Sequence, residues 1–122
     1  MTELITALNA VTATTTSSAI NIEDAKKVVL QYQRAAHGSG STAFTATVSV
    51  DGTNYVTYNK WISNLANAIS EGVTRVGSVT LSANGVGFLT MDPDDSFKWI
   101  KVTATETTDG THSAWIYKVL DN

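Results

Sequence analysis

The sequence contains no cysteine and a single proline among its 122 residues. The lack of cysteine excludes disulfides, thiolate zinc sites and cysteine nucleophiles, and it leaves the redox state of the compartment open. The one proline, Pro93, lies in the acidic segment Asp92–Asp95, where we predict a turn because proline cannot donate to a β-ladder.

Charge is also scarce. Lys, Arg, Asp and Glu make up 16% of the chain, and the formal net charge is −3 at pH 7. The largest basic cluster is the pair Lys26–Lys27, which is too small to neutralise a phosphate backbone, so we expect no nucleic-acid partner. No apolar run approaches the ~20 residues of a membrane span, and Glu3 lies where a signal peptide needs basic residues. We therefore expect no membrane partner and no signal peptide.

What the chain does have is strict alternation of apolar and polar side chains. From Phe44 to Val50 the apolar residues alternate with Thr and Ser, and Asp51–Gly52 follows, which predicts a strand and a hairpin into residues 54–58. Asn84–Gly85 predicts a second hairpin, between the segments before and after it. The same alternation recurs in residues 27–34, 100–105 and 113–120.

About eight such segments, spaced roughly ten residues apart, predict an all-β fold, an antiparallel β-sandwich or a jelly-roll-like arrangement. We expect residues 1–18 to be an N-terminal arm or edge strand and residues 19–122 to form the sandwich domain. Residues 59–72 remain ambiguous. They fit either a short helix near residues 60–70 that ends at Gly72 or an apolar loop across one end of the sandwich.

Two features predict a binding surface. The arm has apolar residues at helix-like spacing, but Thr6 and Asn9 are poor helix formers, so we expect it to be stable only when docked. Trp99 and Trp115 alternate with the inward positions of the last two strands and so point outward. The predicted subunit or partner interface consists of Leu4, Ile5, Leu8, Val11, Trp99, Trp115 and Tyr117.

No motif for catalysis or metal binding is found. His37 and His112 both adjoin predicted turns, and we interpret them as surface histidines, whereas Glu106 reads as a solvated carboxylate. The aspartates of residues 92–95 offer oxygen ligands to Ca²⁺, but they lack the glycine and bidentate glutamate that a calcium loop needs. We therefore predict a protein that is not an enzyme, with no catalytic residue, cofactor or metal.

The block Val48–Tyr55 resembles the strand, Ser-x-Asp-Gly and aromatic hairpin of small β-sandwich structural proteins of tailed bacteriophages. The resemblance extends more loosely from Ala19 to the C-terminus, where Thr108–Gly110 precedes an Ala-Trp-Ile-Tyr strand. It implies a capsid decoration protein or a fibre or tail subunit in the virion, assembled in the host cytoplasm with other virion proteins. It also implies a homo-oligomer, for which a closed trimer is the expected form.

Two functions from different classes follow. The first is a viral structural protein that acts through self-assembly and docking. The second is a monomeric carbohydrate-binding or adhesion module, which predicts an exposed row of aromatic side chains and no self-association. The aromatic residues fit a core best, then a subunit interface, and a sugar platform least.

Overall fold

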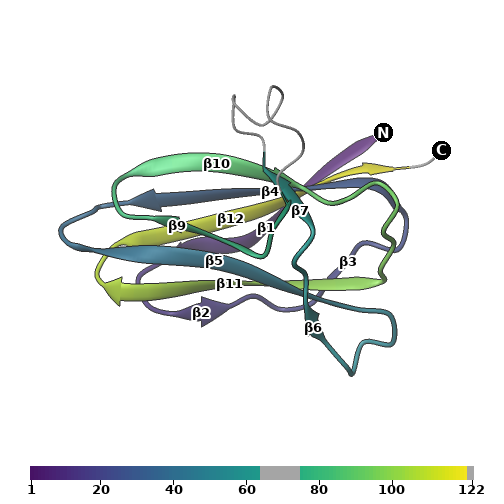
Figure 1. The fold of residues 1–122 in the computed structure, drawn as a ribbon, viewed down its shortest axis with the longest axis horizontal. Helices are drawn as coiled ribbons and strands as arrows, with labels where there is room; N and C mark the ends of the chain where they lie inside the picture. The colour runs from purple at the N-terminus through teal and green to yellow at the C-terminus, as the bar shows by residue number, and fades with distance from the viewer. Residues whose placement is uncertain (64–74, 121–122) are drawn as a thin grey trace.

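The alternating segments form two antiparallel sheets that pack face to face, as Figure 1 shows. The computed structural model describes residues 1–63 and 75–120. The first sheet has the strand order β1 (Thr2–Val11), β12 (Thr111–Leu120), β4 (Ala25–Ala35), β10 (Gly85–Thr90), β7 (Trp61–Ser63) and β8 (Arg75–Val76). The second has the order β2 (Thr15–Thr16), β11 (Trp99–Thr108), β5 (Gly40–Ser49) and β6 (Val56–Thr57), while β3 (Ile20–Asn21) also pairs with β11 and β9 (Ser78–Leu81) also pairs with β5.

The connections between sheets give the fold its topology. β1–β2, β4–β5, β9–β10 and β11–β12 all cross from one sheet to the other at the end of the sandwich where Gly40 lies opposite Thr108. We call this the crossing end. The result is a jelly roll, with β1, β12, β4 and β10 in one sheet and β2 or β3, β11, β5 and β9 in the other. The predicted antiparallel sandwich is confirmed. Short strands β6, β7 and β8 are added between β5 and β9.

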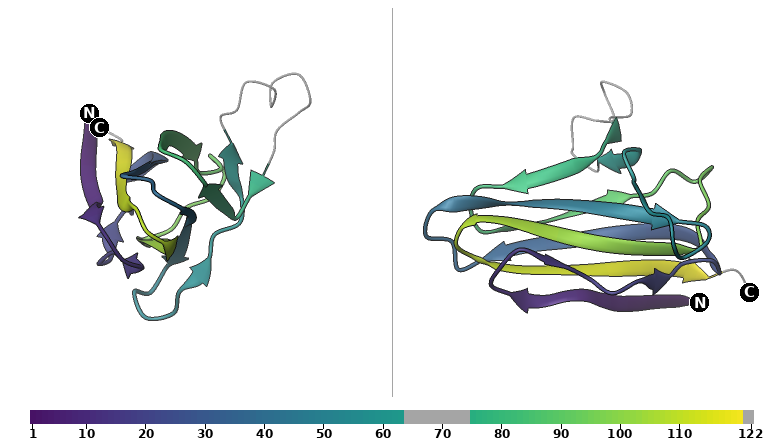
Figure 2. Two further views of the ribbon diagram at one scale, coloured as in Figure 1. Left: turned by 90° about the vertical axis from the view of Figure 1, so that its left-hand side faces the viewer. Right: turned by 90° about the horizontal axis from the view of Figure 1, so that it is seen from below.

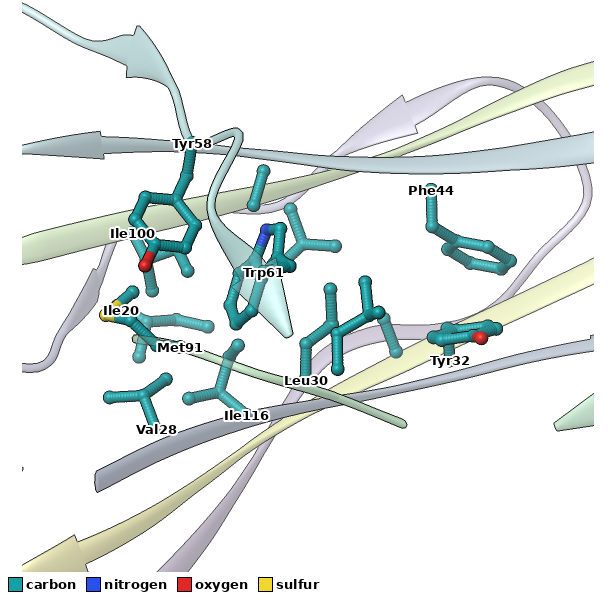
Figure 3. Close-up of a cluster of buried hydrophobic side chains, with 14 of the residues drawn as sticks. Ile20, Val28, Leu30, Tyr32, Phe44, Tyr58, Trp61, Met91, Ile100 and Ile116 are labelled. Carbon is teal, nitrogen blue, oxygen red and sulfur yellow. The ribbon is translucent and has the colours of Figure 1, made fainter. Parts of the chain in front are cut away.

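The inward faces follow the predicted alternation. Val28, Leu30 and Tyr32 of β4 are buried, as are the matching positions of the other long strands, which are Phe44, Ala46, Val48, Ile100, Val102, Ala104, Ala114 and Ile116. Figure 3 shows Trp61 inside this core beside Tyr58, whose ring meets it edge-on with centroids 4.9 Å apart. Trp61 is therefore a core residue on strand β7. The helix expected near residues 60–70 falls largely outside the described residues, and no helix long and apolar enough to cross a membrane occurs within them.

The first predicted hairpin is confirmed. β5 and β6 pair antiparallel, with Val48 opposite Val56, and Gly52 has a φ of 79° in the connecting loop. Asp51 closes the loop, because its carboxylate accepts hydrogen bonds from the backbone N–H groups of Thr53 and Asn54. These hydrogen bonds hold the pKa of Asp51 well below its usual range. Val50 departs from the alternation and is 69% exposed, because the strand ends at Ser49.

The second predicted hairpin is wrong. β9 pairs with β5 in the second sheet, whereas β10 pairs with β4 in the first, so Asn84–Gly85 belongs to a crossing between sheets. The turn dipeptide specifies a local bend and not the partner of the strand that follows. Here the Asn84 side chain serves another loop, because its carbonyl oxygen accepts a hydrogen bond from the backbone N–H of His37.

Removing a ring from the core tests this packing. Phe44 is fully buried, and we expect Phe44→Ala to lower the free energy of unfolding by about 3–5 kcal/mol, through lost burial and the cavity left behind. Val50→Ala is the matched control and should change it by less than about 0.5 kcal/mol. Urea unfolding at constant m-value measures both, and equal losses in the two variants would contradict the core assignment.

Candidate assembly surface

Strand β1 is the outer edge of the first sheet, as Figure 2 shows. From Thr2 to Thr6 it pairs with β12 in unbroken register, with Leu4 opposite Tyr117 and Thr6 opposite Trp115. The N–H of Leu120 donates to the carbonyl oxygen of Met1 over 2.8 Å, which makes these two residues a hydrogen-bonded pair. Because such pairs alternate in an antiparallel ladder, the backbone groups of Thr2, Leu4 and Thr6 point away from β12, toward the open edge.

The outward side of this edge is apolar. Leu4 is 61% exposed and Tyr117, directly opposite on β12, is 36% exposed. Trp115 lies on the same outward face, two residues before Tyr117, and is partly buried. Phe88 and Val86 of β10 are also exposed on this sheet. We define the edge surface as Thr2, Leu4, Thr6, Trp115 and Tyr117.

The inward side of the same edge carries charged side chains that form ion pairs with one another. Lys118 is buried, and its ammonium group lies 3.2 Å from the Glu3 carboxylate and 3.0 Å from that of Asp24. Burial alone would lower the pKa of Lys118, but the hydrogen bonds to Asp24 and Glu3 outweigh it and raise the pKa. The only charge on the regular part of β1 is therefore already paired with its own sheet.

The remaining arm residues of the predicted interface point into the molecule. Leu8 is buried, while Ile5 and Val11 are partly buried and pack against the core. Register shifts between Thr6 and Leu8 and between Leu8 and Val11 explain their spacing, because each bulge adds one residue. The helix-like spacing of this segment is thus a strand with two bulges, and only Leu4 of the four arm residues faces solvent.

Trp99 does not share a face with Trp115. It lies on the outward side of the second sheet, opposite Asn21 and Ser49, with the Gly52 loop against its indole. Nearby, the ammonium group of Lys101 lies 4.3 Å from the centroid of the Tyr55 ring. The structure therefore divides the predicted interface residues among two opposite outer faces and the core.

A buried polar cluster at the crossing end is the feature that the sequence interpretation missed. The Arg34 side chain is fully buried and donates to the carbonyl oxygens of Ser39 and Asp109, to His37 Nδ1 and to the Thr42 hydroxyl. The Asp109 carboxylate lies 3.2 Å from the guanidinium and also accepts hydrogen bonds from two backbone N–H groups of the β4–β5 loop. Arg34 thereby joins two of the connections that cross between the sheets.

The cluster continues through His112. Its Nδ1 lies 2.8 Å from the Thr42 hydroxyl and its Nε2 3.1 Å from a carboxylate oxygen of Glu106. One assignment satisfies every member: Arg34 donates to Thr42, Thr42 to His112, and His112 to Glu106. The interpretation of His112 as a surface residue is wrong, because its side chain is fully buried, and the Glu106 carboxylate is largely covered.

The order Thr42–His112–Glu106 is that of a nucleophile, a base and an orienting acid. Thr42 and His112 are both fully buried, however, and the Arg34 guanidinium already occupies the Thr42 oxygen. A substrate carbonyl has no route to that oxygen, so the arrangement acts here as a structural hydrogen-bond chain.

The acidic turn is also used structurally. The Asp95 carboxylate accepts a hydrogen bond of 2.7 Å from the Tyr58 hydroxyl, and the Asp92 backbone N–H donates to the same hydroxyl. Burial and the Asp95 carboxylate raise the pKa of Tyr58 well above its usual range. Within the described ranges no three acidic or histidine side chains gather as a metal site. An open cavity of about 170 Å³ lies beside this turn, lined by Val56, Lys60 and Phe97 among others.

Comparison with known proteins shows a fold and no family. No family model and no curated sequence matches the chain. Among solved structures, the SPBc2 prophage-derived protein YomS is similar, with a TM-score of 0.60 and 12% identity over 97% of this chain and 94% of that one. PirA matches at a TM-score of 0.45, with 11% identity over 97% and 93% of the chains, and a Bacillus endospore appendage pilus protein at 0.40, with 15% identity over 99% and 85%.

The buried arginine gives the first prediction from this region. We expect Arg34→Met to lower the free energy of unfolding by about 3 kcal/mol or more, because the Asp109 charge and several buried oxygens lose their donor. Lys101→Met, which removes a partly exposed cation from the second sheet, should cost less than about 1 kcal/mol. Equal losses measured by urea unfolding would show that the cluster does not stabilise the crossing end.

The paired carboxylate predicts a pH dependence. The Gly38 and Ser39 N–H groups and the Arg34 charge lower the pKa of Asp109 below 3.8, so its contribution to stability is complete above that pH and is lost as the pH falls through the folded-state value. The difference in unfolding free energy between the native chain and Asp109→Asn should therefore be constant from pH 7 to 5. It should shrink below about pH 4. A difference that is independent of pH down to 2.5 would contradict the pairing.

Proposed function

We propose that this protein is a non-enzymatic structural subunit that acts through self-assembly. The observation that carries the proposal is the edge surface, where a strand with outward-facing backbone groups lies beside the exposed side chains of Leu4 and Tyr117. An edge of this kind is a template for pairing with another chain, and proteins that stay monomeric usually blunt it with charge, proline or a covering loop. Here the outward residues of the edge are threonine, leucine, tryptophan and tyrosine.

In this proposal the subunit belongs to a virion, as a capsid decoration protein or a fibre or tail subunit assembled in the host cytoplasm. The similar fold of a prophage-derived protein supports a phage context. The sequence resemblance of the Val48–Tyr55 hairpin to phage structural proteins supports it independently. The burial of Thr42 and His112 supports a role without catalysis, since these two side chains are closed to substrates.

A carbohydrate-binding module is the competing function, and the placement of the rings weighs against it. Tyr58 and Trp61 are core residues, Trp99 is covered by the Gly52 loop, and the Tyr55 ring is already faced by Lys101. A sugar platform needs ring faces that are free to stack in a row. Phe88, Trp115 and Tyr117 are the aromatic side chains left for that role among the described residues, and the last two lie within the edge surface.

Solution mass tests the proposal. At micromolar concentration we expect light scattering to give a stable multiple of the 13.0 kDa chain. Tyr117→Thr should weaken association at least tenfold, because it removes apolar contact area while replacing one residue type that favours strands by another. Val56→Thr is the matched control on the second sheet, where Val56 is 64% exposed, and it should leave the mass unchanged.

A single mass of 13.0 kDa at every concentration would contradict self-assembly. In that case the monomer should be titrated with soluble oligosaccharides. A saturable quenching of its tryptophan fluorescence that Tyr117→Thr abolishes would favour the carbohydrate-binding module over the structural subunit.

A further inference from the structure

The edge surface is self-complementary, and we propose that its partner is the same strand of a second copy of this chain, paired antiparallel about a two-fold axis at Leu4. This inference rests on the proposed self-assembly and names its contact. The two first sheets would then join, edge to edge, into one continuous sheet.

The backbone supplies the first argument. Thr2, Leu4 and Thr6 present their N–H and C=O groups to the open side of β1, as the Leu120–Met1 hydrogen bond requires. With Leu4 opposite Leu4 of the second copy, Thr2 lies opposite Thr6, and each of these three positions falls in a hydrogen-bonded pair. No other register about a two-fold axis places all three of these residues in hydrogen-bonded pairs. The bulges that follow Thr6 bend the strand and limit the pairing to this segment.

The side chains supply the second argument. On the outward face the sequence Thr-x-Leu-x-Thr reads the same in both directions around Leu4, so threonine meets threonine and leucine meets leucine. Thr–Thr pairs and apolar pairs are favourable directly across antiparallel strands. The row continues on each side through Tyr117 and Val29, which lie opposite Leu4 and Tyr117 in their own sheet. An apolar stripe therefore runs across β4, β12 and β1 of both copies.

Charge supplies the third argument. A two-fold axis at Leu4 places Glu3 opposite Ile5 of the second copy, so identical carboxylates do not meet. Glu3 is moreover paired with Lys118 of its own chain over 3.2 Å. The segment has no lysine or proline of the kind that protects exposed edges from their own copies. A strand from a different protein would need its own residues complementary to Thr2, Leu4 and Thr6. A second copy of this chain supplies such residues from its own β1.

This contact makes an isologous dimer, which a closed trimer cannot contain within itself. The expected mass is therefore twice 13.0 kDa, or a larger even multiple in which dimers are joined by another surface. The trimer expected from the sequence resemblance remains the alternative. Finding a trimer would support self-assembly and contradict the β1 contact.

Cysteine scanning tests the register directly, because the native chain contains no cysteine. In the proposed pair the two Leu4 Cα atoms are about 5.5 Å apart, within disulfide range. Leu4→Cys should therefore form a disulfide-linked dimer nearly completely on mild oxidation with oxidised glutathione. The Thr6 positions of the two copies are offset by about 13 Å along the strands, so Thr6→Cys should stay largely unlinked. Val86→Cys, at a residue 56% exposed on β10, reports random collisions.

A charge variant tests the contact without cross-linking. Leu4→Lys places two ammonium groups opposite each other on the axis and should raise the dissociation constant of the dimer at least tenfold. Leu4 is exposed, so the fold should survive, and a thermal melt monitored by circular dichroism verifies this. Val86→Lys adds the same charge to the same face away from the edge and should leave the mass unchanged.

The outcomes separate the two proposals. A dimer lost in Leu4→Lys and cross-linked in Leu4→Cys supports both. A trimer, or a dimer whose mass survives Leu4→Lys and whose Leu4→Cys links no better than Val86→Cys, overturns the β1 contact and leaves self-assembly standing. A monomer at every concentration overturns both, and association that appears only with a different protein shows that the edge serves a foreign strand and overturns the second-copy contact.

Discussion

The jelly roll depends on a buried cation at its crossing end. A chain that passes repeatedly between two sheets at one end leaves loop carbonyl oxygens there without strand partners, and buried polar groups need partners. The Arg34 guanidinium supplies donors to the loops on both sides, and Asp109, in the β11–β12 loop, accepts hydrogen bonds from the Gly38 and Ser39 N–H groups of the β4–β5 loop. A lysine would offer a point charge where this end needs a planar fork. The end of the molecule is thereby closed, and its histidine–threonine chain is sealed from solvent.

The same topology leaves one edge open. The second sheet is bounded by strands of two to four residues, β2, β3, β6 and β9, which offer few unpaired backbone groups. The first sheet ends at β8, of two residues, on one side and at β1, of ten residues, on the other. Among the described strands, β1 is thus the long edge. The bulges lie in its second half, which leaves the segment before them as the regular stretch whose outer side has no partner strand.

The sequence predicts the sandwich well because alternation reports the inward face directly. It also carried a signal for the polar cluster. Arg34, Thr42 and His112 are the next inward positions after Tyr32, before Phe44 and before Ala114, so the alternation itself places three polar side chains inside. These three side chains come together because the chain crosses between the sheets at this end, and no local sequence pattern specifies the crossings. The hairpin predicted at Asn84–Gly85 failed for the same reason. The bulges in β1 space its apolar residues as in a helix, although the segment is a strand.

The fold by itself does not distinguish assembly from sugar binding, because jelly rolls serve as both capsid and lectin domains. The placement of a few side chains bears on the choice between them. A sugar platform requires a row of rings with free faces, whereas an edge contact requires apolar side chains aligned with unpaired backbone groups. Tyr117 lies on β12, directly opposite Leu4 of β1, and β1 is the edge strand of the sheet. Its position is the one that the proposed edge contact requires.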